Sequence, residues 1–303
     1  MKRTEAAEEF RTVRDVLRYG VTRFGECRLA FGHGSHSAWD EAVYLVLSHL
    51  HLPLTEIEPF LDARLLSIER ISLLKLIEKR CAGVPAAYLT QEAWLGEYRF
   101  YVDQRAIIPR SLIAEPLFEG LAPFIAKPAE IRRVLELCTG AGSLAIIAAD
   151  VFPNAKIDAV DISADALAVA QKNVSDYGLS DRIRLIESDL YDAVKGERYD
   201  LILCNPPYVN DASMLNLPIE YRHEPKLALA GGKDGMDVIR RVLAGAAAHL
   251  KRNARSALVL EIGHERDHFD AAFPGFPYTS LLTSAGEDEV LLIDVATLRA
   301  LPS

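Results

Sequence analysis

The four residues Asn205-Pro206-Pro207-Tyr208 place two hydrogen-bond acceptors beside an aromatic ring in a stiff loop. They follow the apolar residues 199–204, which are typical of a buried parallel strand, and ligands of α/β sheets bind beyond the carboxyl ends of such strands. Consecutive prolines fix φ and set the directions of the neighbouring carbonyls. The Asn205 side-chain carbonyl, the Pro206 backbone carbonyl and the Tyr208 ring therefore suit a planar group that bears an NH2. A rigid turn that only closes the strand is the alternative interpretation.

A loop with two glycines stands earlier in the chain, between an expected strand and an expected helix. Gly140 and Gly142 let the backbone approach a ligand at the amino end of that helix. The spacing differs from a dinucleotide fingerprint, because Ile146 occupies the place of the third glycine. The loop therefore favours a nucleotide-like ligand without a pyrophosphate.

Two aspartates follow the next two expected strands. Asp161 ends the second strand, where an acidic residue accepts hydrogen bonds from both ribose hydroxyls. Asp189 follows the third strand and can reach the edge of an adenine. Either aspartate alone would also fit a helix cap. Polar groups at four consecutive strand ends together indicate a nucleoside site.

The elements that must position these residues alternate between strand and helix from residue 131 onward. This alternation predicts an α/β fold with a doubly wound, mostly parallel sheet. The expected strands are residues 134–137, 156–161, 182–187, 201–204 and 257–261. The expected helices are residues 143–151, 164–176 and 238–250. Residues 289–294 are expected to form a last antiparallel strand at the edge of the sheet.

The first ninety residues show helical rather than alternating spacing. Helices are expected at residues 5–19 and 68–82, with Gly20 and Gly83 as stops, and after a cap formed by Ser37 with Asp40. Residues 92–95 and 98–102 predict a hairpin around Gly96. The expected organisation is a helical substrate-recognition domain, a linking β-hairpin and a catalytic domain, at residues 1–90, 91–110 and 111–303.

Composition indicates an ordinary globular protein, because half of the 303 residues are apolar and a quarter are charged. No apolar run approaches the ~20 residues that span a bilayer, and the first nine residues lack the apolar core of a signal peptide. We therefore expect a cytoplasmic protein without a membrane partner. The cysteines and the clustered histidines lack the spacing of metal ligands or of a disulfide framework: Cys27, Cys81, Cys138, Cys204, His33, His36, His49 and His51.

The charge is distributed unevenly along the chain. Residues 1–105 carry 14 Lys and Arg against 15 Asp and Glu, whereas residues 106–303 carry 20 against 28. Nucleic acid is bound mostly through phosphate neutralisation, so the acidic C-terminal part is a poor candidate for direct nucleic acid binding. It suits a basic partner better, and improved solubility is the alternative explanation.

The four strand ends together resemble those of the class I S-adenosylmethionine-dependent methyltransferases. Within that class, Asn-Pro-Pro-Tyr occurs in enzymes that methylate planar nitrogens of adenine, guanine or glutamine. The chain is most similar to the protein-(glutamine-N(5)) methyltransferases. The features that carry this resemblance are residues 222–225 (Arg-His-Glu-Pro), residues 107–115 ahead of the glycine loop, and the helical domain. The variants Pro109-Arg110-Ser111, His223-Glu224-Pro225 and Cys138-Thr139-Gly140 resemble the branch that acts on large-subunit (50S) ribosomal protein L-three. Two positions depart from that branch, Glu136 in place of Asp and Leu112 in place of Pro.

The resemblance implies a seven-stranded sheet, S-adenosylmethionine as cofactor, and methyl transfer to a glutamine side chain of ribosomal protein L-three. The cofactor-binding residues that it implies are Glu136, Cys138, Thr139, Gly140, Gly142, Asp161, Ile162, Asp189, Leu190 and Asn205. The implied catalytic residues are Asn205, Pro206 and Tyr208, and the implied substrate-binding residues are Asn205, Pro206, Pro207, Tyr208 and Glu224. Three alternatives stay open: a release-factor methyltransferase, an RNA or DNA amino-methyltransferase, and a catalytically silent binding module.

Overall fold

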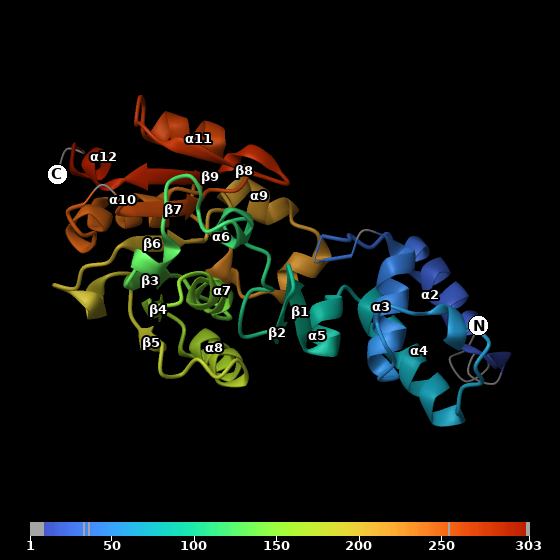
Figure 1. Ribbon diagram of the computed structural model, residues 1–303. Coiled ribbons are helices and arrows are strands. Elements are labelled where there is room, and N and C mark those ends of the chain that lie inside the picture. Colours follow the sequence, from blue (N-terminus) through green and yellow to red (C-terminus); the bar gives the residue numbers. More distant parts are fainter. Residues whose placement is uncertain (1–8, 33, 36, 254, 301–303) are drawn as a thin grey trace. The chain divides into compact units, whose positions relative to one another are not determined.

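The computed structural model describes residues 9–32, 34, 35, 37–253 and 255–300 (Figure 1). The chain forms two compact units. One unit contains the chain up to Ala93 together with Leu217–His223, and the other contains Trp94–Asn216 and the chain from Glu224 onward. In the described part of the chain, no helix is long and apolar enough to cross a membrane.

The first unit is helical. Its helices are α2 (Val13–Cys27), α3 (Ala38–His49), α4 (Ser67–Cys81) and α5 (Ala86–Thr90), with 3-10 turns at Glu58–Phe60 and Ile219–His223. The predicted caps of α3 and α4 are confirmed: the Ser37 hydroxyl accepts from the Asp40 N–H at 3.1 Å, and Gly83 follows α4 with φ +92°.

The prediction of a helix over residues 5–19 is wrong where the structure describes it, because residues 10–12 are not helical and the helix ends at Cys27; residues 5–8 lie outside the described part. The helix begins after Thr12, whose side chain caps the Asp15 N–H, and it continues through Gly20. Gly20 does not end the helix: it lies inside α2, and a Cβ there would make ordinary contacts at 3.5 Å from Ile77 and 3.6 Å from Ala42. The left-handed cap is Arg28, with φ 53°.

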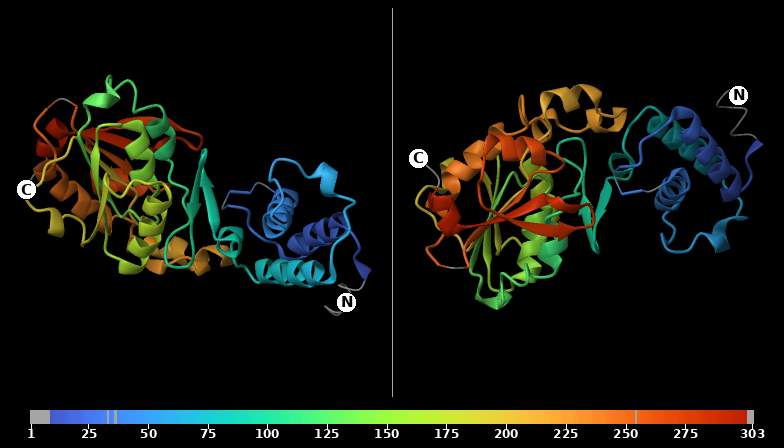
Figure 2. Two further views of the ribbon diagram at one scale, coloured as in Figure 1. Left: turned by 60° about the horizontal axis from the view of Figure 1, so that its bottom comes forward. Right: turned by 90° about the horizontal axis from the view of Figure 1, so that it is seen from above.

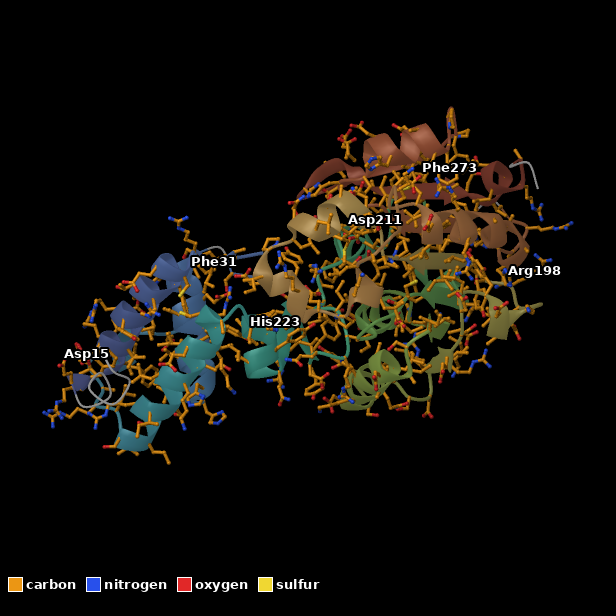
Figure 3. All side chains as sticks on the ribbon, turned by 180° about the vertical axis from the view of Figure 1, so that it is seen from behind. Asp15, Phe31, Arg198, Asp211, His223 and Phe273 are labelled. Carbon is orange, nitrogen blue, oxygen red and sulfur yellow. The ribbon has the colours of Figure 1, made fainter. Side chains whose placement is uncertain are left out.

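A buried ion cluster joins residues 217–223 to the helices of this unit. Arg80, which is 1% exposed, donates to Glu41 Oε1 at 2.5 Å and to Glu220 Oε1 at 3.2 Å. The same Glu220 oxygen accepts from the Ala30 N–H at 2.9 Å. His223, at the end of the segment, is labelled in Figure 3. No local pattern in the sequence indicates that this distant segment belongs to the helical unit.

The predicted hairpin is confirmed as β1 (Glu92–Leu95) and β2 (Tyr98–Tyr101), with Gly96 at φ +60° in its turn. Its second strand is attached to the second unit. The Tyr101 N–H donates to Asn173 Oδ1 at 2.8 Å, and the Asn173 amide donates back to the Tyr101 carbonyl at 3.0 Å. Asn173 lies on helix α8 (Ala164–Asp176), so β2 is fixed to the unit that carries the sheet.

The second unit contains a seven-stranded sheet in the order β5-β4-β3-β6-β7-β9-β8. The strands are β3 (Arg133–Leu137), β4 (Lys156–Asp161), β5 (Ile183–Glu187), β6 (Leu201–Cys204), β7 (Ala257–Glu261), β8 (Thr279–Thr283) and β9 (Gly286–Asp294). The first five are mutually parallel, and β9 runs antiparallel to both β7 and β8. The doubly wound, mostly parallel sheet is confirmed. The prediction that residues 289–294 form the edge strand is wrong, because β8 pairs on their outer side.

Helices cover both faces of this sheet (Figure 2). The helices of this unit are α6 (Ala114–Phe118), α7 (Ser143–Val151), α8, α9 (Asp211–Asn216), α10 (Asp237–His249), α11 (Arg266–Ala272) and α12 (Val295–Ala300), with 3-10 turns at Pro128–Glu130, Asp192–Val194 and Lys226–Ala228. Alternate strand residues enter two separate cores: Leu201 and Leu203 pack with α7, whereas Ile202 and Cys204 pack with α10. Both faces of each central strand are therefore buried, and polar residues gather at the strand ends.

Candidate active site

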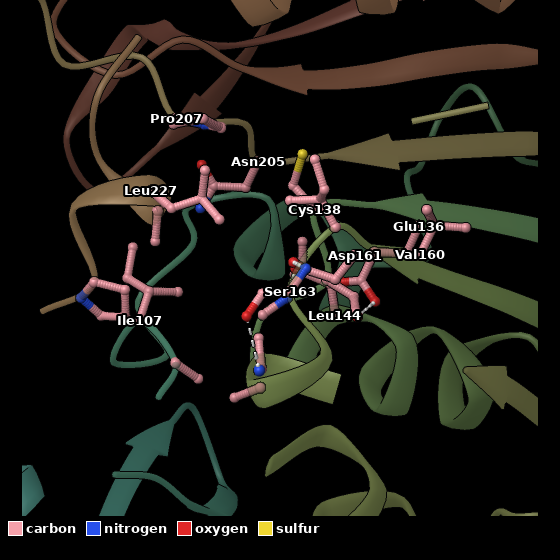
Figure 4. Close-up of a pocket in the computed structure, with 18 of the residues that line it drawn as sticks. Ile107, Glu136, Cys138, Leu144, Val160, Asp161, Ser163, Asn205, Pro207 and Leu227 are labelled. Carbon is pink, nitrogen blue, oxygen red and sulfur yellow. Dashed lines mark hydrogen bonds between the residues drawn. The ribbon is translucent and has the colours of Figure 1, made fainter. Parts of the chain in front are cut away.

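A pocket lies at the carboxyl ends of β3, β4 and β6, entirely within the second unit (Figure 4). Ile107 and Leu227 face Asp161 and Leu144 across it. Its lining includes every residue predicted to bind the cofactor except Gly142: Glu136, Cys138, Thr139, Gly140, Asp161, Ile162, Asp189, Leu190 and Asn205. Gly142 instead packs against helix α8, since a Cβ there would lie 3.1 Å from the Ala170 Cβ.

Asp161 fixes the glycine loop through its carboxylate. Oδ2 accepts from the Gly140 N–H at 2.8 Å, and Oδ1 accepts from the Ser163 N–H at 2.9 Å. Burial raises the pKa of Asp161, and these backbone donors oppose that shift. A carboxylate offers about four acceptor sites, so Asp161 can hold the loop and still accept from ligand hydroxyls.

Glu136 is a second buried carboxyl group, only 2% exposed. Its Oε2 accepts from the Thr139 hydroxyl and from the Ala145 N–H at 3.0 Å, the latter in the first turn of α7. Burial raises the pKa of Glu136 to about 8, and the nearby Asp161 charge adds to the shift. A cationic group in the pocket would oppose this effect.

The cations of the pocket wall are each paired with a carboxylate. Arg241 donates to Asp189 Oδ2 at 2.8 Å, and Arg105 pairs with Asp103 at 2.7 Å. Arg110 binds both oxygens of the buried Glu224 at 2.9 and 2.8 Å. A pocket with paired cations and two buried acids does not suit a phosphate.

The Asn205-Pro206-Pro207-Tyr208 loop stands at the edge of this pocket. Asn205 and Pro207 line it, whereas Pro206 and Tyr208 do not. The loop continues into a small parallel bridge, in which the Val209 N–H donates to the Leu229 carbonyl at 2.8 Å. This bridge ties the loop to residues 226–230, which follow the Arg-His-Glu-Pro motif.

Glu224, predicted to bind substrate, also lies outside the pocket lining. Besides Arg110, it accepts from the Ile108 N–H at 3.3 Å, and its side chain is fully buried. Glu224 therefore anchors residues 107–110, which form one wall of the pocket.

Sequence reasoning missed Glu261 and Arg241. Glu261, 3% exposed, accepts from the Tyr208 hydroxyl at 3.2 Å. Its place at the end of an expected parallel strand was the available signal. Arg241 lies on α10 and reaches the pocket only in the folded chain, so no local pattern indicates it. Among the described residues, no group of three His, Cys, Asp or Glu could hold a metal.

The strand order, the glycine loop after β3 and the acid at the end of β4 define a class I methyltransferase. A family model described as methyltransferase small domain matches residues 120–219. Three relatives are each named ribosomal protein uL3 glutamine methyltransferase. The Bordetella pertussis protein is 57% identical over 94% of this chain and 96% of its own. The Burkholderia pseudomallei protein is 54% identical (98% and 99%), and that of Neisseria meningitidis serogroup A is 52% identical (95% and 95%).

The chain belongs to the family of ribosomal protein uL3 glutamine methyltransferases. This confirms the family and the branch that the sequence motifs predicted.

Proposed function

We propose that the protein transfers a methyl group from S-adenosylmethionine to the side-chain amide nitrogen of a glutamine in ribosomal protein uL3, the L-three protein. The observation that carries the proposal is the acceptor loop at the edge of a pocket lined by Gly140, Asp161 and Asp189, in a chain that shares 57% identity with a uL3 glutamine methyltransferase. The relatives cover nearly the whole chain, so the helical unit is included in the likeness.

The charged groups that line the pocket fit S-adenosylmethionine. The cofactor is a nucleoside with a cationic sulfonium and no phosphate, and the pocket contains the carboxyl group of Asp161 but no unpaired arginine among its described lining. Asp161 would accept from the ribose hydroxyls and Asp189 from the adenine amino group. Ile162 and Leu190 would flank the base. When bound, the cofactor supplies an electrophilic methyl group.

The acceptor loop would activate the glutamine by binding both of its amide protons. An amide nitrogen is a poor nucleophile, because its lone pair is delocalised into the carbonyl. Acceptance of the two N–H groups by Asn205 and by the Pro206 carbonyl leaves more electron density on nitrogen. Fixing nitrogen in a near-attack position contributes up to roughly 7–11 kcal/mol in favourable systems.

Tyr208 would pack on the amide plane and would not act as a base. Burial, and then the neighbouring Glu261 charge, raises the pKa of Tyr208 well above its usual value. The phenol therefore stays protonated at neutral pH. Proton loss can follow transfer, once the nitrogen has become cationic.

Recognition of the protein substrate falls to the helical unit and to residues 211–221. Helix α9 has no buried residue, and Leu215 on it is 80% exposed. The side chain of Leu215 is therefore available for contact with a protein substrate. A cytoplasmic site of action and the absence of direct nucleic acid binding are part of the proposal.

The test is methyl transfer from labelled S-adenosylmethionine to recombinant uL3. One methyl group on a glutamine side chain is expected, located by mass spectrometry, and a uL3 variant with that glutamine changed to alanine should stay unlabelled. A release factor is the control for the sister branch. Preferential labelling of the release factor, or labelling of nucleic acid alone, would overturn the proposed substrate.

A further inference from the structure

Glu261 stands beside the acceptor loop because of strand register. β6 and β7 are parallel, with Cys204 opposite Leu260. The next residues along the two strands are Asn205 and Glu261, which places this acid at the same sheet edge as the acceptor loop. Glu261 is 3% exposed, so its carboxyl group is held inside the protein.

Both oxygens of Glu261 have partners on different segments. Oε1 accepts from the Tyr208 hydroxyl at 3.2 Å. Oε2 accepts from the Ser111 hydroxyl and from the Leu112 N–H at 3.0 Å. One buried side chain therefore connects the acceptor loop to the end of the segment that forms a pocket wall.

The ring of Tyr208 is restrained on a second side by Gly263. This glycine has φ +53°, and a Cβ there would lie 2.4 Å from Cε2 of the tyrosine ring. The ring thus packs directly on the backbone that follows β7, and the Glu261 carboxylate fixes its hydroxyl end. Two restraints from the same segment define the plane of the ring.

We propose that Glu261 is a positioning residue for methyl transfer, which acts by holding the Tyr208 ring at the angle needed to pack on the substrate amide. The proposal rests on the proposed function, in which Tyr208 contacts the glutamine side chain. Glu261 itself contacts neither substrate nor cofactor in this scheme. Its loss should therefore affect turnover more than the affinity of either ligand.

A double-mutant cycle tests the connection between the two residues. Tyr208→Phe and Glu261→Ala should each lower kcat by about tenfold, because a misplacement of about 1 Å costs up to about a hundredfold and a smaller displacement of the ring costs less. The double variant should lose no more than the stronger single variant, since both changes break the same contact. Glu261→Gln should keep kcat near the wild-type value, because its amide can donate to the Tyr208 oxygen while its carbonyl accepts from Ser111 and Leu112.

The matched control is Tyr199→Phe, which removes another buried hydroxyl that donates to a carboxylate, Asp158, at 2.7 Å. This variant should have the wild-type kcat. Calorimetric binding of S-adenosylmethionine and the thermal midpoint report whether each variant is folded. If Glu261→Ala does not fold, the kcat of Tyr208→Phe tests the proposal. An unimpaired kcat in that variant overturns it.

Other outcomes also overturn it. Multiplicative losses in the double variant would mean that the two residues act independently. A fall in cofactor affinity at unchanged kcat would mean that Glu261 serves the pocket wall through Ser111 and Leu112. Wild-type protein that methylates no uL3 would instead refute the proposed function, which separates the two failures.

Discussion

Asn205 is the residue on which the proposed chemistry depends most directly, because its side-chain carbonyl would accept from the substrate amide. Asn205→Ala should leave cofactor affinity nearly unchanged and lower turnover about a hundredfold, or ~2.7 kcal/mol of barrier. Calorimetry and single-turnover kinetics measure the two quantities. Asn154→Ala, in an exposed loop, is the control. Collapse of cofactor binding would restore the interpretation of this loop as a rigid turn only.

The raised pKa of Glu136 predicts that the free energy of unfolding depends on pH. Its pKa is raised by burial from 4.5 in the unfolded chain to about 8, so the folded state retains a proton that the unfolded state has lost. Between these values the contribution of Glu136 to stability falls by about 1.4 kcal/mol per pH unit as pH rises. Glu136→Gln should remove this slope.

The difference in thermal midpoint between Glu136→Gln and wild type should therefore grow from pH 6 to pH 8, as measured by calorimetry. The comparison with the matched variant removes the contributions of the other buried acids, Asp161 and Glu261, which both proteins share. A constant difference across this range would show that Glu136 titrates normally.

At the scale of elements, the buried carboxylate of Glu220 fixes residues 217–223 to the helical unit. Glu220→Ala removes the acceptor for Arg80 and Ala30, so the segment should open more often. Trypsin should then cleave after the exposed Arg222 about tenfold faster, equivalent to about 1.4 kcal/mol in the opening equilibrium. Glu220→Gln keeps an acceptor and is the control. Equal cleavage of all three proteins would contradict the anchoring role.

Most elements of the sheet were predictable, because local signals mark their limits. Helix α8 starts where Ser163 caps the Ala166 N–H, and β6 is a run of fully buried residues. Strand β8 was missed because only Leu281 and Thr283 of its five residues are buried. The prediction that Gly20 ends the helix was wrong because a glycine disfavours a helix without preventing it, and α2 continues through Gly20 to Cys27.

Part of the site was also predictable, because some of its residues stand at places that local signals mark. Residues at strand ends, such as Asp161 and Asn205, occupy places that the order of elements specifies. Glu224 and Glu261 depend on partners more than a hundred residues away or in another loop, and no local pattern encodes such contacts. The role of Glu224 as an anchor of the pocket wall therefore emerged only from the folded chain.

For the whole molecule, the excess of acid in residues 106–303 predicts an electrostatic encounter with a basic protein substrate. The kcat/KM for uL3 should fall several-fold when ionic strength rises from about 50 to about 300 mM, because screening shortens the range of the attraction. Cofactor affinity, measured by calorimetry over the same range, should change less. A salt-independent kcat/KM would assign the acidic surface to solubility.

The chain passes more than once between the two units, and this affects how preference for a protein substrate could be exchanged among relatives. The chain passes between the units after Ala93, after Asn216 and after His223. A recombination event that replaced only the chain up to Ala93 would combine Arg80 and Glu41 from one relative with Glu220 from another. Because the proposed function assigns substrate recognition to the helical unit, transplanting a target preference would require two separate gene fragments, and we expect lineages that diverge in target to inherit changes in both together.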